Sequence, residues 1–397
     1  MTILDKVIAD TARRSSAASP LGAAQAQQIG GYDLIALVLQ GGGALGAYQG
    51  GVFEALCEAN IAPRWFSGVS IGAINGAIMA GNHPGNRLDR LHDFWETLSG
   101  RKVWSFAPEG DQFRKWRNAV SSMMTMQYGL PGFFRPHQVN PWFAASGAST
   151  ATSFYDTSDL RDTLNRLVDW DLLNDTDHRL SVGAVNVETG NFRYFDSALE
   201  RLGPEHIMAS GALPPAFAPV KIENDHYWDG GIVSNTPLQY LLECETIKDT
   251  LVFQIDLFNA RGPLPRDMNA VLDRHKDIMY SSRTRHNTDT FRRTHHMRLA
   301  LRDALMRVPA DLRTPSDKAF LADMEDVAQV NIIHMVYQKK VYEGQSLDYE
   351  FSGNSMREHW QAGLDDTRRT LTHKDWLAMP TEADGVSVHN VHQEDPT

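Results

Sequence analysis

The stretch LIALVLQGGGALGAYQGGVFEALCEA, residues 34–59, decides the fold of this chain. Its first six residues form a continuous apolar run, which is typical of a strand buried on both faces of a sheet. Residues 47–59 predict a helix, so the glycines between the two elements lie in a strand-to-helix turn. Gly41, Gly43 and Gly46 match the pattern G-x-G-x-x-G. Backbone amides in such a turn are suited to negative charge, either a nucleotide phosphate or the oxygen of a reacting ester.

A second strand, turn and helix follow directly. Residues 64–70, RWFSGVS, predict a short strand, and residues 71–81, IGAINGAIMAG, predict a helix rich in small residues. Two such units in succession indicate a parallel α/β sheet with right-handed crossovers. Their junction runs from Gly68 to Gly72 as G-x-S-x-G, which places the Ser70 hydroxyl at the carboxyl end of a strand. On its own, this pattern is equally typical of a tight packing turn.

The rest of the chain contains further expected elements. Residues 103–150 break the strand-helix rhythm without clean periodicity and are interpreted as an insertion. Order returns over residues 155–173, where Thr157 or Ser158 is expected to cap a helix. The expected later elements are a hairpin of residues 180–187 and 192–195, helices near 205–211 and 236–242, strands in 226–231 and 250–258, helical structure over 267–310, and one last strand at 330–337.

A nucleophilic serine needs a base. Several histidines follow Ser70, so chain order alone leaves a Ser-Asp-His triad open, but none lies in a stretch resembling a catalytic loop. Asp229 is the better candidate because it stands between Trp228 and a pair of glycines. Apolar surroundings desolvate a carboxylate and raise its affinity for protons, which makes it a more competent base. The alternative interpretation of Asp-Gly-Gly is an ordinary β-turn.

Three motifs now stand in order: GGGALG at 41–46, GVSIG at 68–72 and DGG at 229–231. Together with Asn75-Gly76-Ala77 and the SNTPL that follows DGG, they resemble the patatin-like phospholipase family over about residues 34–260. The resemblance implies a three-layer α/β/α fold with a mostly parallel central sheet. It also implies a Ser–Asp dyad without histidine, with nucleophile Ser70, base Asp229, motif glycines Gly68, Gly72, Gly230 and Gly231, and an oxyanion hole around Gly41, Gly42, Gly43 and Ala44. Many relatives carry arginine where this chain has Leu45, so no electrostatic role for that position is carried over.

The resemblance and the change of composition near residue 262 suggest a plan for the chain. We expect a flexible N-terminal arm at residues 1–31 and a patatin-like catalytic domain at 32–262, with the 103–150 insertion as a candidate lid. Residues 263–397 are expected to form a mainly helical accessory region. There, MYSSRTR at 279–285 and FSGNSMREHWQAG at 351–363 look like the region that follows some bacterial patatin-like domains.

The activity implied by the resemblance is hydrolysis of a lipid or other acyl ester through an acyl-serine intermediate, with no metal or other cofactor. Three alternatives stay open: transfer of the acyl group to an acceptor other than water, a nucleotide-binding module, and a non-catalytic lipid-binding protein. The nucleotide reading is disfavoured because no acidic residue stands at the tip of the next strand and no G-K-[ST] occurs. Retention of both Ser70 and Asp229 disfavours the non-catalytic protein.

Composition narrows the class of protein. The chain has 397 residues, of which 42% are hydrophobic and 22% charged, as in ordinary globular proteins. A net charge of −11 argues against nucleic acid as a partner. Two cysteines make no disulfide framework and favour a cytoplasmic setting. The N-terminus has no uninterrupted apolar segment and there is no run of about 18 apolar residues, so any membrane contact is expected to be peripheral. Nothing in the sequence indicates an oligomeric state.

Two further groups of residues bear on access to a substrate. Met123, Met124, Met126, Phe133 and Phe134 are expected either to line an acyl channel or lid or simply to cover the core. A local excess of arginine predicts either attraction to anionic head groups or, more commonly, a solvated helix face paired with acidic neighbours. These arginines are Arg283, Arg285, Arg292, Arg293, Arg298, Arg302 and Arg307.

Overall fold

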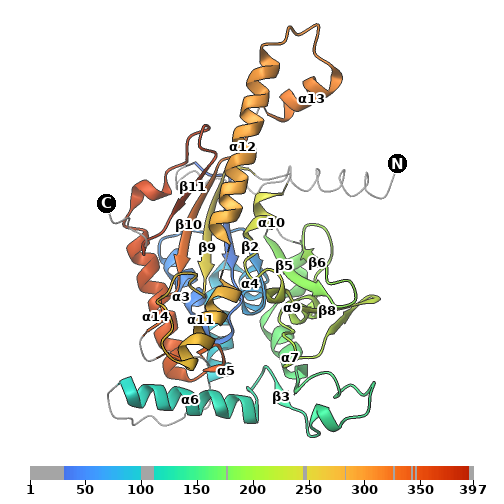
Figure 1. Ribbon diagram of the computed structural model, residues 1–397, viewed down its shortest axis with the longest axis vertical. Coiled ribbons are helices and arrows are strands. Elements are labelled where there is room, and N and C mark those ends of the chain that lie inside the picture. Colours follow the sequence, from blue (N-terminus) through green and yellow to red (C-terminus); the bar gives the residue numbers. More distant parts are fainter. Residues whose placement is uncertain are drawn as a thin grey trace.

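The structure is a computed structural model that describes residues 31–99, 111–175, 178–244, 248–281, 283–324, 327–340, 343–344 and 347–392. The arm expected at residues 1–31 lies almost wholly outside the described residues, as does the start of the expected insertion. Within the described part, a central sheet stands between two layers of helices (Figure 1). The expected three-layer α/β/α architecture is confirmed.

The central sheet has nine strands among the described residues, in the order β11-β10-β9-β1-β2-β5-β8-β7, with β6 also paired to β5. The strands from β11 to β5 run parallel, and β6, β8 and β7 add antiparallel pairs at one side. The bounds are β1 Leu34–Leu39, β2 Trp65–Gly68, β5 Arg179–Asn186, β6 Phe192–Asp196, β7 Val220–Ile222, β8 Asp225–Asp229, β9 Thr250–Asp256, β10 Val330–Val336 and β11 Val386–His389. A separate two-stranded ribbon joins β3 (Arg135–Pro136) to β4 (Tyr155–Asp156).

Strand β1 explains why its sequence is a continuous apolar run. Side chains alternate between the two faces of a strand. Ile35, Leu37 and Leu39 belong to the larger core, while Ala36 and Val38 belong to the smaller core on the other face. Because helices cover both faces, neither set of side chains reaches water, and the strand carries no polar alternation.

Helices cover the sheet on both sides. The larger core is closed by helices that include α3, α4, α5 and α14, and the smaller core by α10 with a contribution from α12. The helix bounds are α3 Ala47–Glu58, α4 Ile71–Ala80, α5 Arg87–Ser99, α6 Asp111–Tyr128, α7 Ser158–Leu167, α8 Trp170–Asp175, α9 Pro204–Ser210, α10 Leu238–Leu242, α11 Met268–Tyr280, α12 Thr284–Met306, α13 Pro315–Asp323 and α14 Gly353–Thr370. The short 3-10 helices are η1 Gly43–Gly46, η2 Pro84–Asn86, η3 Pro141–Phe143, η4 Gly230–Ile232, η5 Leu347–Tyr349 and η6 Lys374–Leu377.

Most of the elements expected from the sequence are present; the structure adds one helix that was not expected, and one expectation is wrong. Residues 111–128 form the 18-residue helix α6, so this part of the expected insertion is regular. Strand 330–336 is not the last one, because β11 at residues 386–389 extends the sheet beyond it. Thr157 does occupy the N-cap of α7, yet its side chain makes no capping hydrogen bond.

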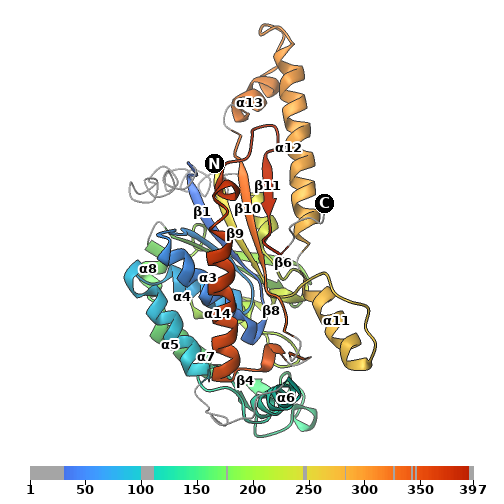
Figure 2. The ribbon, with the colours of Figure 1, turned by 90° about the vertical axis from the view of Figure 1, so that its left-hand side faces the viewer.

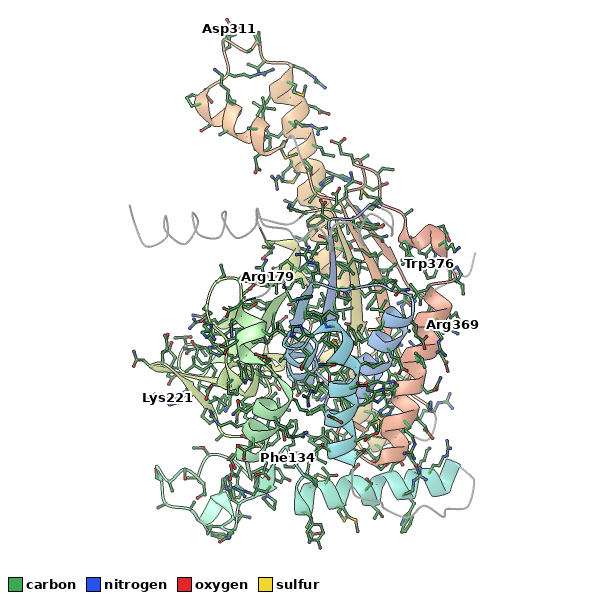
Figure 3. All side chains as sticks on the ribbon, turned by 180° about the vertical axis from the view of Figure 1, so that it is seen from behind. Phe134, Arg179, Lys221, Asp311, Arg369 and Trp376 are labelled. Carbon is green, nitrogen blue, oxygen red and sulfur yellow. The ribbon has the colours of Figure 1, made fainter. Side chains whose placement is uncertain are left out.

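The residues after 262 are mainly helical, as expected, and they also share the central sheet. Strands β10 and β11 pair in series onto β9, and α14 runs along α3 (Figure 2). In contrast, the distal part of α12 and α13 project away from the rest of the molecule, with Asp311 at the tip (Figure 3).

Candidate active site

Ser70 occupies a sharp turn between β2 and α4. Its backbone has φ 57° and ψ −124°, a left-handed conformation that a non-glycine residue adopts only under constraint. The turn is held because the Ser70 amide donates to the carbonyl of Ser210 at 3.1 Å. A Cβ atom on Gly72 would collide with the carbonyl of Leu39, and Gly68 lies equally close to Gly72. The glycines of the G-x-S-x-G motif are therefore required by close backbone approach.

Asp229 lies at the end of β8 and is 2% exposed. Its Oδ1 accepts a hydrogen bond of 2.7 Å from the Gly231 amide, and the Ser70 hydroxyl donates to the same carboxyl group. Burial raises the pKa of Asp229 to about 7, although both hydrogen bonds act in the opposite direction. Gly230 packs against the carbonyl of Gly183 on β5, which fixes the turn behind the carboxylate.

The glycine-rich loop after β1 lies beside these two side chains. The Gly41 amide is engaged, since it donates to the Asn235 carbonyl at 3.3 Å. Within the described residues, the amides of Gly42, Gly43 and Ala44 have no hydrogen-bond partner. Gly43 has φ +55°, and a Cβ atom there would collide with the carbonyl of Asp348. The loop therefore offers three unpaired donors in a conformation that requires glycine at its centre.

One buried carboxamide holds this loop in place. The Oε1 atom of Gln40 accepts from the amides of Leu257 and Phe258 at 2.6 and 2.9 Å. Its Nε2 atom donates to the Thr236 hydroxyl at 2.9 Å and to the Tyr280 carbonyl at 3.0 Å. Gln40 thereby ties the end of β1 to the end of β9, to the segment after the DGG motif and to α11.

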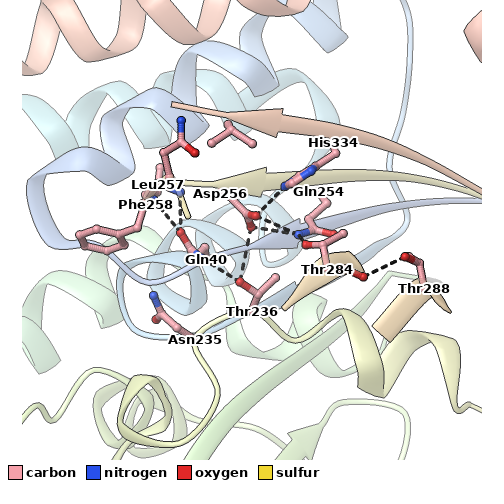
Figure 4. Close-up of polar contacts among 12 residues, drawn as sticks. Gln40, Asn235, Thr236, Gln254, Asp256, Leu257, Phe258, Thr284, Thr288 and His334 are labelled. Carbon is pink, nitrogen blue, oxygen red and sulfur yellow. Dashed lines mark hydrogen bonds and ion pairs between the residues drawn. The ribbon is translucent and has the colours of Figure 1, made fainter. Parts of the chain in front are cut away.

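The network continues away from the loop through polar side chains (Figure 4). The Thr236 hydroxyl approaches Asp256 Oδ1 at 3.4 Å, and Asp256 Oδ2 lies 2.6 Å from His334 Nε2. Gln254 also donates to both carboxylate oxygens of Asp256. These residues come from β9, β10 and the loop before α10. Thr236 lies in the SNTPL stretch that contributed to the resemblance, whereas Gln254, Asp256 and His334 were not identified from the sequence, because no local motif marks them.

Ser70 lines a pocket to which each of the three motifs contributes residues. Its walls are mainly apolar and aromatic, with a few polar groups from α11 and η5. The described lining residues are Gly41, Gly42, Gly43, Ser70, Ile71, Ile74, Phe133, Phe134, Gly211, Leu213, Ala216, Phe217, Asp229, Gly231, Asn235, Phe258, Lys276, Tyr280, Asp348, Tyr349 and Phe351. No histidine is among them. His226 instead pairs with Glu188 at 2.8 Å, and His206 Nδ1 accepts from the Gly203 amide at 2.9 Å.

The residues expected to control access divide into two groups. Phe133 and Phe134 are buried and line the pocket, and Phe134 appears beside the α6 segment in Figure 3. The three methionines of α6 are exposed by 40–62% and are absent from the pocket wall. Leu45 is fully buried in the larger core.

Acidic neighbours pair with part of the arginine-rich segment. Arg292 pairs with Asp289, Arg298 with Asp323, and Arg302 with Glu382. At these three positions the structure therefore shows arginines paired with acidic neighbours, which is the second interpretation given for the arginine-rich segment.

The described ranges contain neither a helix suited to spanning a membrane nor a cluster of side chains suited to holding a metal ion. No helix there is both long and apolar enough to cross a membrane. The same residues contain no group of three or more histidine, cysteine, aspartate or glutamate side chains placed to hold a metal ion.

Comparisons with known proteins bear on this site. A family model described as patatin-like phospholipase matches residues 37–242, and another described as patatin phospholipase matches residues 278–383. No curated protein matches the sequence. Among solved structures, the chain is similar to VipD from Legionella pneumophila, with a TM-score of 0.38 and 15% identity over 85% of this chain and 67% of that one.

Proposed function

This chain belongs to the patatin-like phospholipase family, a family of lipid hydrolases, and from that premise we propose that it is a serine acyl-ester hydrolase acting on lipid esters through Ser70 and Asp229. The observation that carries the proposal is the hydrogen bond from the Ser70 hydroxyl to a buried carboxyl group whose pKa is about 7. A carboxylate with that pKa is matched to proton transfer near neutral pH. Ser70 is then the nucleophile and Asp229 the base.

The first half of the reaction forms an acyl-serine. Asp229 accepts the proton of the Ser70 hydroxyl while Ser70 Oγ attacks the ester carbonyl carbon. The resulting tetrahedral oxyanion collapses, the bond to the alcohol breaks, and Asp229 returns its proton to the departing alkoxide. In the second half, Asp229 takes a proton from water as the water oxygen attacks the acyl-serine carbonyl carbon. The bond to Ser70 Oγ then breaks, Asp229 returns the proton to Oγ, and the carboxylic acid is released.

The glycine-rich loop supplies the proposed oxyanion hole. The unpaired amides of Gly42, Gly43 and Ala44 are the donors, and Gly41, whose amide is engaged by Asn235, holds the loop to the segment after the DGG motif. Loss of one such donor typically costs about 2.7–4 kcal/mol in activation free energy. The N-terminus of α4 begins at Ile71, directly after the nucleophile, and adds a favourable dipole for developing negative charge.

The pocket wall favours a substrate with an acyl chain. Phe217 lies with its ring centre 6.0 Å from that of Phe133 and 5.3 Å from that of Phe134. Ile71 and Ile74 of α4 line the same pocket. Burial of an apolar chain against these side chains removes hydrocarbon from water, and this supplies binding energy that a short ester lacks.

Two variants test the proposal on a nitrophenyl acyl ester. Ser70→Ala and Asp229→Asn should each lose at least about two orders of magnitude in turnover while staying folded. Asp225→Asn is the matched control, because Asp225 lies on the same strand but is exposed and outside the pocket. A fluorophosphonate probe should label wild-type protein and fail on Ser70→Ala. Wild-type turnover by either dyad variant would contradict the assignment.

Product analysis separates hydrolysis from acyl transfer. Free fatty acid should accumulate from a lipid ester in equal amount to the released alcohol when water is the acceptor. Acylated acceptor formed in the presence of lysolipid or a thiol, in place of free acid, would instead assign the same acyl-serine to a transferase.

A further inference from the structure

The pocket carries a positive charge that the dyad does not use. Among its described lining residues, Lys276 is the one cation. It comes from α11 and forms an ion pair with Asp348 of η5, and the side chains are 19% and 13% exposed. Both residues belong to the part of the chain after residue 262, which thereby completes the wall of the pocket.

This cation is held close to the proposed oxyanion loop. The carbonyl of Asp348 packs directly on Gly43, so η5 rests on the loop itself. The Lys276 ammonium lies 5.3 Å from the centre of the Tyr349 ring, and Tyr280 of α11 stacks obliquely on Phe258 at 5.5 Å. A charged and aromatic cluster therefore borders the site where an ester carbonyl would be attacked.

The remaining pocket wall is different in chemistry. Phe133, Phe134 and Phe217 form a continuous group of rings without charge. If an ester buries its acyl chain among these rings, its alcohol portion lies on the side of the pocket formed by the charged and aromatic residues of α11 and η5. A charged cluster is costly to bury without a function, because both charges lose part of their hydration.

We propose that Lys276 binds the phosphate of a phosphate-bearing acyl ester and so makes the pocket selective for phospholipid or lysophospholipid over neutral glyceride. The inference rests on the proposed hydrolase function. Asp348 holds the ammonium toward the pocket in the absence of substrate, and it competes with the phosphate for the same charge. An ammonium in the wall of a mostly apolar pocket forms a charge-assisted hydrogen bond to phosphate that a neutral head group cannot replace.

The test compares two substrates with the same acyl chain, lysophosphatidylglycerol and monoacylglycerol, on the full chain. Lys276→Met should lower kcat/KM for the phosphate ester at least about tenfold and leave the neutral ester within about twofold. Lys276→Arg should retain the preference.

Lys339→Met is the matched control. Lys339 pairs with Asp277 of α11 at 2.5 Å but does not line the pocket, so this variant removes a lysine that holds the same helix. An equal loss in Lys339→Met, or an equal loss on both substrates in Lys276→Met, would overturn the inference and leave the hydrolase intact. Absence of turnover on every ester, without labelling of Ser70 by a fluorophosphonate, would instead contradict the proposed function.

Discussion

The Ser70 hydroxyl donates a hydrogen bond to the Asp229 carboxyl group across the width of strand β5. Ser70 follows β2 and Asp229 ends β8, and each of these strands pairs with β5. The two side chains meet because β2 runs parallel to β5 while β8 runs antiparallel to it. The contact therefore depends on the order and direction of the strands in the sheet. It places a serine hydroxyl against a carboxyl group whose pKa burial raises to about 7.

The pKa of Asp229 predicts the acid limb of the pH profile. With a pKa of about 7, the carboxyl group is protonated and unable to act as a base at lower pH. We expect kcat/KM on a nitrophenyl ester to rise about tenfold per pH unit below pH 7 and to level off above it. Initial-rate assays from about pH 5 to 9 measure this dependence, and a kcat/KM that stays constant across that range would exclude Asp229 as the base.

The raised pKa of Asp229 also predicts that this buried carboxyl group lowers the stability of the folded protein at neutral pH. The folded-state pKa of about 7 lies above the unfolded value near 3.9, so the folded protein retains a proton that the unfolded chain releases. The contribution of Asp229 to stability is greatest below about pH 4, falls as pH rises to 7 and stays low above it. Three pKa units correspond to about 4 kcal/mol.

Asp229→Asn should therefore stabilise the protein above pH 7 by a few kcal/mol. An asparagine at this position keeps an acceptor for the Gly231 amide and carries no charge to desolvate. Urea unfolding of both proteins at about pH 8 and pH 4.5 measures the difference. A stability gain of the same size at both pH values would show that desolvation of the carboxylate is not its source.

Gln40 is expected to act as a positioning residue for the glycine-rich loop. Gln40→Glu keeps the size and the acceptor for the Leu257 amide but removes the donor to Thr236 and the Tyr280 carbonyl. A loop displaced by about 1 Å can lower the rate about 10²-fold, so kcat should fall steeply with little change in KM. Gln127→Glu, at an exposed position of α6, is the control. Equal kinetics in the two variants would refute the positioning role.

The close contact between α3 and α14 predicts that adding a single methyl group there lowers the stability of the protein. A Cβ atom on Gly51 would collide with the carbonyl of Trp360, and one on Gly363 would collide with that of Tyr48. Gly51→Ala should lower the free energy of unfolding by about 1–3 kcal/mol, because the two helices must separate. Gly85→Ala, where the added atom meets nothing, should be close to neutral. Thermal unfolding of both variants measures the difference.

The motifs and regular elements that were predicted from the sequence are those whose local residue pattern matches their surroundings in the folded protein. The apolar run of β1 reflects its burial on both faces of the sheet. The glycines around Ser70 reflect the close backbone approach in the turn between β2 and α4. Strand β11 was missed because four residues of partly polar sequence pair only with β10. Helix α6 was missed because the side chains that it buries, which include Ser121, Ser122 and Thr125, are polar, while Trp116 and three methionines are exposed, so no apolar periodicity marks the helix.

The sequence by itself indicated the first two strand-turn-helix units and the G-x-S-x-G turn, because each follows from residue types at fixed spacing. The preference for Asp229 over the histidines came from its neighbours and the family resemblance, and it stays a prediction. Only the tertiary structure decided that Gln40 anchors the loop and that Lys276 and Asp348 face the same pocket as Ser70. Those side chains come from separate elements, and no local pattern encodes their meeting. Packing of β9, α11 and η5 around the end of β1 brings them together.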